Sequence, residues 1–163
     1  MSELVLNSSY IAIYLILFQK RVIMADLAKN KEIVRQFFEQ IWNQGDESAI
    51  DRFIAEDAAG NDPKFGIGRE SFRQQWRKWR IAFPDINFAI EELIAEGDVV
   101  VSRWKLTGTH LGQYQDKSAT GKKISVDGVS IDRLRGGMVV SGFDAWDSNV
   151  LSEQLSYSFR ARR

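Results

Sequence analysis

Residues 124–147 read ISVDGVSIDRLRGGMVVSGFDAWD, two runs of alternating apolar and polar residues joined at a pair of glycines. Alternation with a period of two is typical of a strand that buries one face. Adjacent glycines in so short a connection are typical of a tight hairpin turn. We therefore predict an antiparallel hairpin of strands 124–134 and 138–147, closed by Gly136 and Gly137.

Two further strands are predicted before this hairpin. Residues 87–95 and 99–109 are rich in β-branched and other apolar residues, and a short polar segment, Glu96-Gly97-Asp98, separates them. A longer loop then leads to residue 124. Four successive strands with mostly hairpin-sized connections favour an antiparallel sheet.

The sequence before these strands has a helical period instead. Apolar residues recur three and four positions apart in residues 30–43, around 47–55 and in 69–83, where Pro84 ends the pattern. Residues 148–155 are predicted to form a last short helix. We predict an α+β domain in which a curved antiparallel sheet of about four to six strands packs against three N-terminal helices and forms a cone with an apolar cavity.

Composition restricts the chemistry that the protein can perform. A chain of 163 residues with 44% hydrophobic content can bury one core, and its formal net charge of +0 attracts neither nucleic acid nor an anionic membrane. The chain has no cysteine and one histidine, which excludes disulfides, thiol nucleophiles and cysteine-based zinc sites. Any chemistry must therefore use carboxylates, hydroxyls or His110.

The N-terminal residues are predicted to lie outside the domain. The apolar run YIAIYLILF at 10–18 is shorter than the roughly 20 residues that a membrane span requires, and its positive charges follow it, unlike those of a signal peptide. We therefore expect a cytoplasmic protein without a membrane partner. The predicted organisation is an extension at 1–23, with Met24 a candidate start, a domain at 24–156 and a basic tail at 157–163.

Asp144 is the residue that most needs an explanation, because it places a carboxylate in the middle of an apolar strand. A buried, unpaired carboxylate is costly, so such a residue is usually either paired or used. Burial would raise its pKa from about 3.9 towards the working pH, as a general base requires. The alternative interpretation is a structural ion pair with Arg103 or Arg133.

Strand alternation predicts the neighbours of this carboxylate. On its own strand, Gly142 leaves space beside Asp144 and Trp146 supplies a flat apolar wall. Across the hairpin, Ser130 is predicted to lie near Asp144. The predicted shared face comprises Met138, Val140, Gly142, Asp144 and Trp146 on one strand, and Ile124, Val126, Gly128, Ser130, Asp132 and Leu134 on the other.

Three other residues are weaker candidates for contacts with a substrate. His110, the single histidine, follows a strand and is equally suited to a structural hydrogen bond with the next loop. Arg103 alternates with Trp104 on its strand, and the pattern does not say which of the two faces the cavity. Asn61 precedes Asp62-Pro63, which is compatible with a pocket rim and with an ordinary turn.

Several segments, taken in order, resemble one protein family. They are AFPD at 82–85, WKLTGTHLG at 104–112, TGKK at 120–123, RLRGG at 133–137 and FDAWD at 143–147, followed by Leu151 and Gln154-Leu155. From about residue 31 to 155 the chain resembles the SnoaL-like polyketide cyclases (ester cyclases), members of the nuclear-transport-factor-2-like, or cystatin-like, α+β roll superfamily.

This resemblance implies a cofactor-free intramolecular aldol condensation, with Asp144 at the position of the aspartate that removes a proton from a polyketide ester. Two positions depart from the family pattern. Ser130 stands where the characterised cyclases have a histidine, and Gly142 where many relatives have another. Both departures weaken the inference that the substrate is a polyketide, because a donor for the developing oxyanion is lost or reduced to a hydroxyl.

Three hypotheses about function follow. The first is an enzyme of the cyclase type that acts on a small apolar carbonyl metabolite with Asp144 as base. The second is an epoxide hydrolase on the same fold, in which Asp144, Asp132 and Arg103 converge to activate a water molecule. The third is a non-catalytic module that binds a lipophilic ligand or dimerises through the open sheet face. We expect a homo-oligomer, plausibly a dimer, in each case.

Overall fold

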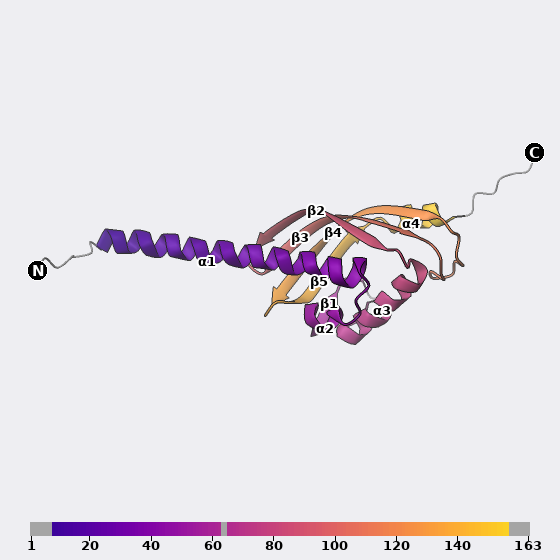
Figure 1. The fold of residues 1–163 in the computed structure, drawn as a ribbon, viewed down its shortest axis with the longest axis horizontal. Helices are drawn as coiled ribbons and strands as arrows, with labels where there is room; N and C mark the ends of the chain where they lie inside the picture. The colour runs from indigo at the N-terminus through magenta and orange to yellow at the C-terminus, as the bar shows by residue number, and fades with distance from the viewer. Residues whose placement is uncertain (1–7, 63–64, 157–163) are drawn as a thin grey trace, which may run out of the picture.

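A computed structural model of the chain describes residues 8–62 and 65–156. Its centre is a five-stranded mixed sheet with the strand order β1-β5-β4-β3-β2 (Figure 1). The strands are β1 (Ile54–Gly60), β2 (Asn87–Glu96), β3 (Val99–Thr109), β4 (Lys123–Arg135) and β5 (Met138–Trp146). The predicted α+β class is confirmed, and β2 to β5 lie within one residue of their predicted bounds.

Strand β1 is the element that the sequence analysis missed. Residues 54–60 read IAEDAAG, and their alanines and acidic residues have a low preference for strands. They nevertheless form a strand because they pair with β5, in parallel, from Ile54 opposite Val139 to Gly60 opposite Gly142. The sheet is therefore mixed, and the prediction of a purely antiparallel sheet was wrong at this edge.

The helices gather on one side of the sheet (Figure 1). They are α1 (Ser8–Phe37), which continues as a π-helical segment η1 (Phe38–Asn43), then α2 (Ala49–Phe53) and α3 (Arg69–Ala82). The last helix, α4 (Ser148–Leu155), packs beside the start of β4, where the Gln154 side chain pairs with the Ser125 backbone. Residues of α1, η1 and α2 bury their apolar faces against the inner face of the sheet, and this contact forms the core.

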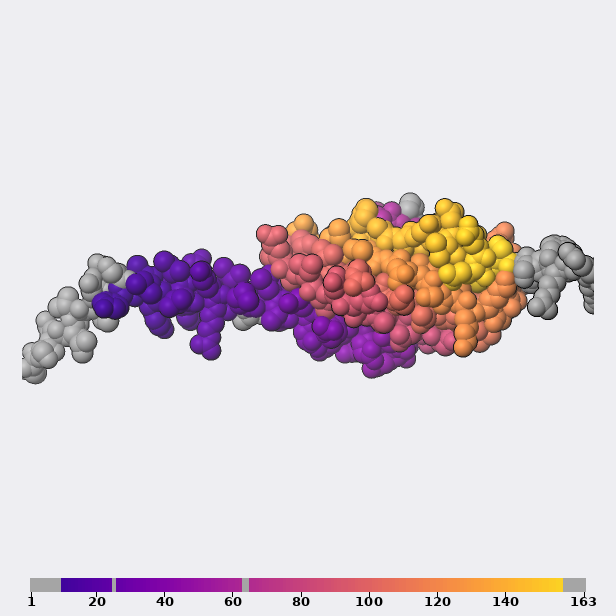
Figure 2. All heavy atoms as spheres, turned by 90° about the horizontal axis from the view of Figure 1, so that it is seen from above, coloured from indigo at the N-terminus to yellow at the C-terminus, as the bar shows by residue number. Residues whose placement is uncertain are grey.

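The N-terminal part of helix α1 projects beyond the sheet and the other helices (Figures 1 and 2). It continues without a break through the predicted boundary at residues 23 and 24. The apolar side chains from Tyr10 to Phe18 are all exposed. No helix in the described ranges is both long and apolar enough to cross a membrane. The predicted basic tail, 157–163, lies outside the described residues.

The hairpin of β4 and β5 forms as predicted. Gly136 and Gly137 have φ angles of 61° and 84°, a conformation that glycine adopts without strain, and they place Arg135 opposite Met138. Leu134 then lies opposite Val139, which faces the core in place of Met138 or Val140. The register shifts by one residue at the next pair, where Arg133 lies opposite Ser141. Prediction of an uninterrupted alternation along β5 was therefore wrong at its start.

The outer face of the sheet is mostly polar, with one row of apolar residues across it. Ile94, Val101, Ile131 and Phe143 lie opposite one another from β2 to β5, and all but Val101 are exposed. The expected homo-oligomer stays a prediction.

Candidate active site

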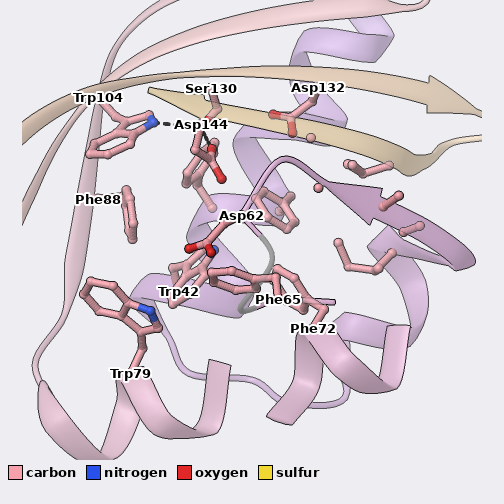
Figure 3. A pocket seen from close by; sticks show the side chains of 18 of the residues that line it. Trp42, Asp62, Phe65, Phe72, Trp79, Phe88, Trp104, Ser130, Asp132 and Asp144 are labelled. Atoms are coloured by element: carbon pink, nitrogen blue, oxygen red, sulfur yellow. Dashed lines mark hydrogen bonds between the residues drawn. The ribbon is translucent and has the colours of Figure 1, made fainter. Parts of the chain in front are cut away.

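A pocket lies between the inner face of the sheet and the helices (Figure 3). Its cavity volume is about 160 Å³, and its mouth leads into a broader, more polar groove that shares Asp144 and Trp146 with it. Aromatic residues supply most of the wall: Phe37, Phe38, Trp42, Phe65, Phe72, Trp79, Phe88, Trp104 and Trp146. The predicted apolar cavity is thus present in the structure.

The aromatic wall is held by hydrogen bonds from the π-helical segment to its neighbours. The Trp76 indole N–H of α3 donates to the Ile41 carbonyl at 3.0 Å. The Asn43 side chain accepts from the Phe88 backbone N–H at 2.7 Å and donates to its carbonyl at 3.1 Å. These bonds join η1 to α3 and β2, and thereby fix Trp42 beside Phe88, with ring centroids 5.3 Å apart.

Ser130 links two other groups of the pocket. The Trp104 indole N–H donates to Ser130 Oγ at 2.8 Å, and Ser130 Oγ donates to Asp144 Oδ1 at 2.5 Å. An indole N–H can only donate, so the serine oxygen must accept from it, and its single proton points to the carboxylate. The predicted proximity of Ser130 and Asp144, which are paired across the hairpin, is confirmed.

The Asn61 side chain holds the backbone of Asp144. It follows β1, and its side-chain amide donates to the Asp144 carbonyl at 3.0 Å and accepts from the Asp144 N–H at 2.8 Å. The Asn61 side chain does not line the pocket. Asn61, predicted as a rim residue, therefore contacts the backbone of Asp144 instead. It reaches this position because β1, the edge strand that precedes it, lies beside β5.

Asp144 has no cationic partner among the described residues. Arg103 pairs with Glu91 and Glu92, and Arg133 pairs with Asp98, both on the far side of the sheet from the pocket. The alternative interpretation of Asp144 as a structural ion pair was therefore wrong.

The environment of Asp144 disfavours its charged form. Water reaches the residue through the open pocket, so it is not buried as predicted, yet mostly protein surrounds its carboxyl group. This loss of solvation raises the pKa of Asp144 above its usual range, the Ser130 hydrogen bond opposes the rise, and nearby Asp62 adds to it.

Asp132 is the carboxyl group that is truly buried. It lies on the inner face of β4, lines the pocket and retains 5% of its exposure. Its Oδ2 atom has no hydrogen-bond partner within the described part of the chain. Burial, and secondly the charge of Asp144, raise the pKa of Asp132 to about 8.

Two predicted site residues do not reach the pocket. Arg103 points to the outer face of β3, because Ser102 and Trp104 take the inner positions. The predicted convergence of Arg103 with Asp132 and Asp144 was therefore wrong. His110 is fully buried behind the wall, with Nδ1 3.1 Å from Thr120 Oγ1 and its ring 5.3 Å from that of Phe83. Burial lowers the pKa of His110, so its ring is neutral at neutral pH.

Sequence reasoning overlooked Trp104 as the donor to Ser130. A signal was available in Gly128, which lies opposite Trp104 in the sheet. A Cβ atom at Gly128 would lie 2.2 Å from Cη2 of the Trp104 ring, so the glycine is required for the indole to lie flat on β4. A glycine inside a strand often marks such a close approach.

Comparison with known proteins shows the family of the chain. A model of the SnoaL-like polyketide cyclase family matches residues 32–155. The chain belongs to the SnoaL-like polyketide cyclase family. No protein with a curated function matches this SnoaL-like chain in sequence.

Solved structures of similar proteins share its fold. TsrD from Streptomyces laurentii is 25% identical with a TM-score of 0.73, over 79% of this SnoaL-like chain and 96% of TsrD. A candidate polyketide cyclase from Acidithiobacillus ferrooxidans is 28% identical with a TM-score of 0.71, over 78% and 94% of the two chains. AclR from Streptomyces galilaeus, a candidate hydroxylase, is 25% identical with a TM-score of 0.71, over 79% and 96%.

Proposed function

We propose that this SnoaL-like protein catalyses an intramolecular aldol cyclisation of a small apolar carbonyl compound, with Asp144 as the general base. One observation carries the proposal. The Asp144 carboxylate faces an aromatic pocket, has no cationic partner in the described ranges, and accepts a 2.5 Å hydrogen bond from Ser130. A base in this setting is accessible to a substrate, and its pKa is raised above the usual range of an aspartate.

The reaction needs one proton acceptor and no other reagent. Asp144 removes a proton from a carbon next to a carbonyl group, and the C–H electron pair becomes an enolate whose negative charge lies on oxygen. The enolate carbon attacks a second carbonyl of the same molecule, which forms a C–C bond and an alkoxide. The alkoxide then recovers the proton from Asp144, so the atoms and charges balance.

The lining of the pocket restricts the class of substrate. Aromatic side chains favour flat, apolar molecules that lie against their faces. No Lys or Arg is found among the described lining residues, whereas three aspartates are: Asp62, Asp132 and Asp144. An acidic pocket repels anions, so the reacting part of the substrate should be neutral before proton removal.

A simple diketone provides the test. Heptane-2,6-dione closes to a six-membered ring by an intramolecular aldol reaction, and chromatography separates the ring from the open chain. We expect the wild-type protein to accelerate closure and Asp144→Asn to lose about 10²-fold or more of that acceleration while remaining folded by circular dichroism. Asp127→Asn is the matched control, because Asp127 lies on the outer face of β4 beside Lys105. Equal rates for Asp144→Asn and the wild type contradict the proposal.

A further inference from the structure

Two carboxyl groups share one wall of the pocket. Ser130 and Asp132 are inner-face neighbours on β4, where Ser130 lies opposite Asp144 and Asp132 opposite Gly142. Gly142 leaves the space that Asp132 occupies, because a Cβ atom there would lie 3.3 Å from Asp132 Oδ1. Figure 3 shows both carboxyl groups on this wall above the aromatic side chains.

The two groups differ in their hydrogen bonds. Asp144 accepts a bond from Ser130, which favours its ionised form. Asp132 Oδ2 is buried and has no partner in the part of the chain that the structure describes. Buried polar atoms almost always have a partner, so an unsatisfied oxygen on a carboxyl group that lines a cavity indicates a group reserved for a ligand.

The charges around Asp132 favour a neutral carboxyl group. Titratable side chains that face it across the pocket are, among the described lining residues, Asp62 and Asp144, both acidic. The helices that cover the pocket present Phe37, Phe38, Trp42, Phe72 and Trp79, none of which is charged. The arginines beside it on β4 point outward, where Arg133 pairs with Asp98 and Arg135 with Asp57.

The two carboxyl groups therefore lose their protons in sequence. Ser130 stabilises the ionised form of Asp144, and nothing comparable stabilises that of Asp132. Repulsion from the charged Asp144, added to burial, raises the pKa of Asp132 to about 8. Asp132 therefore keeps its proton over a range of pH in which Asp144 has lost its own, an arrangement that separates base from acid.

We propose that Asp132 is a second catalytic residue, which keeps its proton while Asp144 is ionised and donates a hydrogen bond to the substrate carbonyl oxygen. This inference rests on the proposed function, since it assigns the donor for the enolate that Asp144 generates. Asp144 takes the proton from carbon, the negative charge moves to oxygen, and the Asp132 O–H bond stabilises that oxygen without leaving Asp132. The donor would occupy the role that the absent family histidines leave open.

The protonation state can be measured without any substrate. In protein labelled with ¹³C at the aspartate carboxyl carbons, we expect one resonance to titrate near pH 8 and to disappear in Asp132→Asn. In Asp144→Asn the same resonance should titrate at lower pH, because the repulsion is removed. A wild-type protein in which every aspartate titrates below pH 6 overturns the proposal.

The donor role can be measured by binding alone. We choose β-tetralone, an aromatic ketone that stays neutral between pH 6 and pH 10, and follow its affinity by NMR over this range. Wild-type affinity should fall about 3- to 10-fold as the pH rises through the pKa of Asp132, because the donor is lost. Asp132→Asn keeps an N–H donor, so its affinity should be retained and independent of pH, whereas Asp132→Leu should bind weakly throughout.

The outcomes separate this inference from the proposed function. Binding requires no turnover, so Asp144→Asn should still bind β-tetralone, and a failure of cyclisation leaves the binding test intact. Asp132→Leu should fold with at least wild-type stability, because it replaces an unsatisfied buried carboxyl group by an apolar side chain of similar size. Undetectable wild-type binding, or equal affinity of the wild type and Asp132→Leu at every pH, overturns the proposal.

Discussion

The Ser130 hydroxyl donates to the Asp144 carboxylate at 2.5 Å, and its oxygen is already committed to accepting from Trp104. The Ser130 proton can therefore point only to the Asp144 carboxylate, and this hydrogen bond favours the ionised state of Asp144. The partial loss of solvation around the carboxyl group acts in the opposite direction. The balance between the two determines at which pH Asp144 can act as a base.

Removal of the Ser130 hydroxyl should move this balance. In Ser130→Ala the pKa of Asp144 should rise further, which shifts the acid limb of the pH–rate profile to higher pH. The Trp104 N–H loses its acceptor at the same time, at a cost to stability of about 1–3 kcal/mol. Ser102 lies opposite Ser130 on β3, is buried and has no hydrogen-bond partner in the described ranges. Ser102→Ala is therefore the control, and a profile that moves equally in both variants contradicts this role for Ser130.

The link between Asn61 and the Asp144 backbone predicts an effect on activity from outside the pocket. Asn61→Ala loses both side-chain bonds, so unfolding in urea should show a loss of about 1–2 kcal/mol. Cyclisation should slow as well, since the carboxyl group is less well positioned. Asn87→Ala removes an exposed amide at the start of β2 and should change neither quantity. Wild-type activity in a destabilised Asn61→Ala would show that the two bonds serve stability alone.

Packing of Trp104 on Gly128 predicts a sensitive position. A methyl group at Gly128 requires the ring to move, because its carbon would lie 2.2 Å from ring atom Cη2. Gly128→Ala should therefore lose about 1–3 kcal/mol of stability and weaken the bond from Trp104 to Ser130. Gly60→Ala is the control, since the nearest atom to its added carbon is the Gly142 carbonyl oxygen at 3.6 Å. Thermal unfolding of the two variants should differ clearly, and equal melting temperatures contradict the packing described.

Stability should depend on pH through Asp132. Its pKa in the folded protein, about 8, is higher than that of an unfolded chain, near 4. The folded state thus binds the proton more tightly, so this contribution to stability is complete below about pH 4 and is lost as the pH rises towards 8. Asp132→Asn removes this pH-dependent contribution. Urea unfolding at pH 5 and pH 9 should show a smaller decrease for Asp132→Asn than for the wild type, and equal decreases contradict the assignment.

Part of the site could be predicted because it lies on a hairpin, which brings Ser130 near Asp144. The exact pairing could not, because the Gly136-Gly137 turn with an unbroken register would place Ser130 opposite Phe143. The extra residue at the start of β5, Val140, brings Asp144 opposite Ser130. What local pattern could not supply is tertiary pairing. Strand β1 forms only because β5 lies beside it, and Asn61 reaches Asp144 only through that strand.

The orientation of β3 and the burial of the carboxyl groups also depend on distant contacts. Ser102 and Arg103 alternate on β3 with no local signal to say which faces inward, because Trp104 and Val101 place apolar residues on both faces. Similarly, the sequence indicated a buried carboxylate at Asp144, whereas the packing of Gly142 and the helices buries Asp132 more completely. Solvent access to a pocket is a property of the whole fold.

Hydrogen–deuterium exchange measures the removal of a proton from carbon by Asp144 directly, without ring closure. β-Tetralone exchanges the hydrogens next to its carbonyl slowly in neutral D₂O, and NMR follows each position. We predict that the wild-type protein and Asp127→Asn accelerate this exchange equally, and that Asp144→Asn loses about 10²-fold or more of the acceleration. A folded Asp144→Asn protein that exchanges the ketone at the wild-type rate would contradict the assignment of Asp144 as the base.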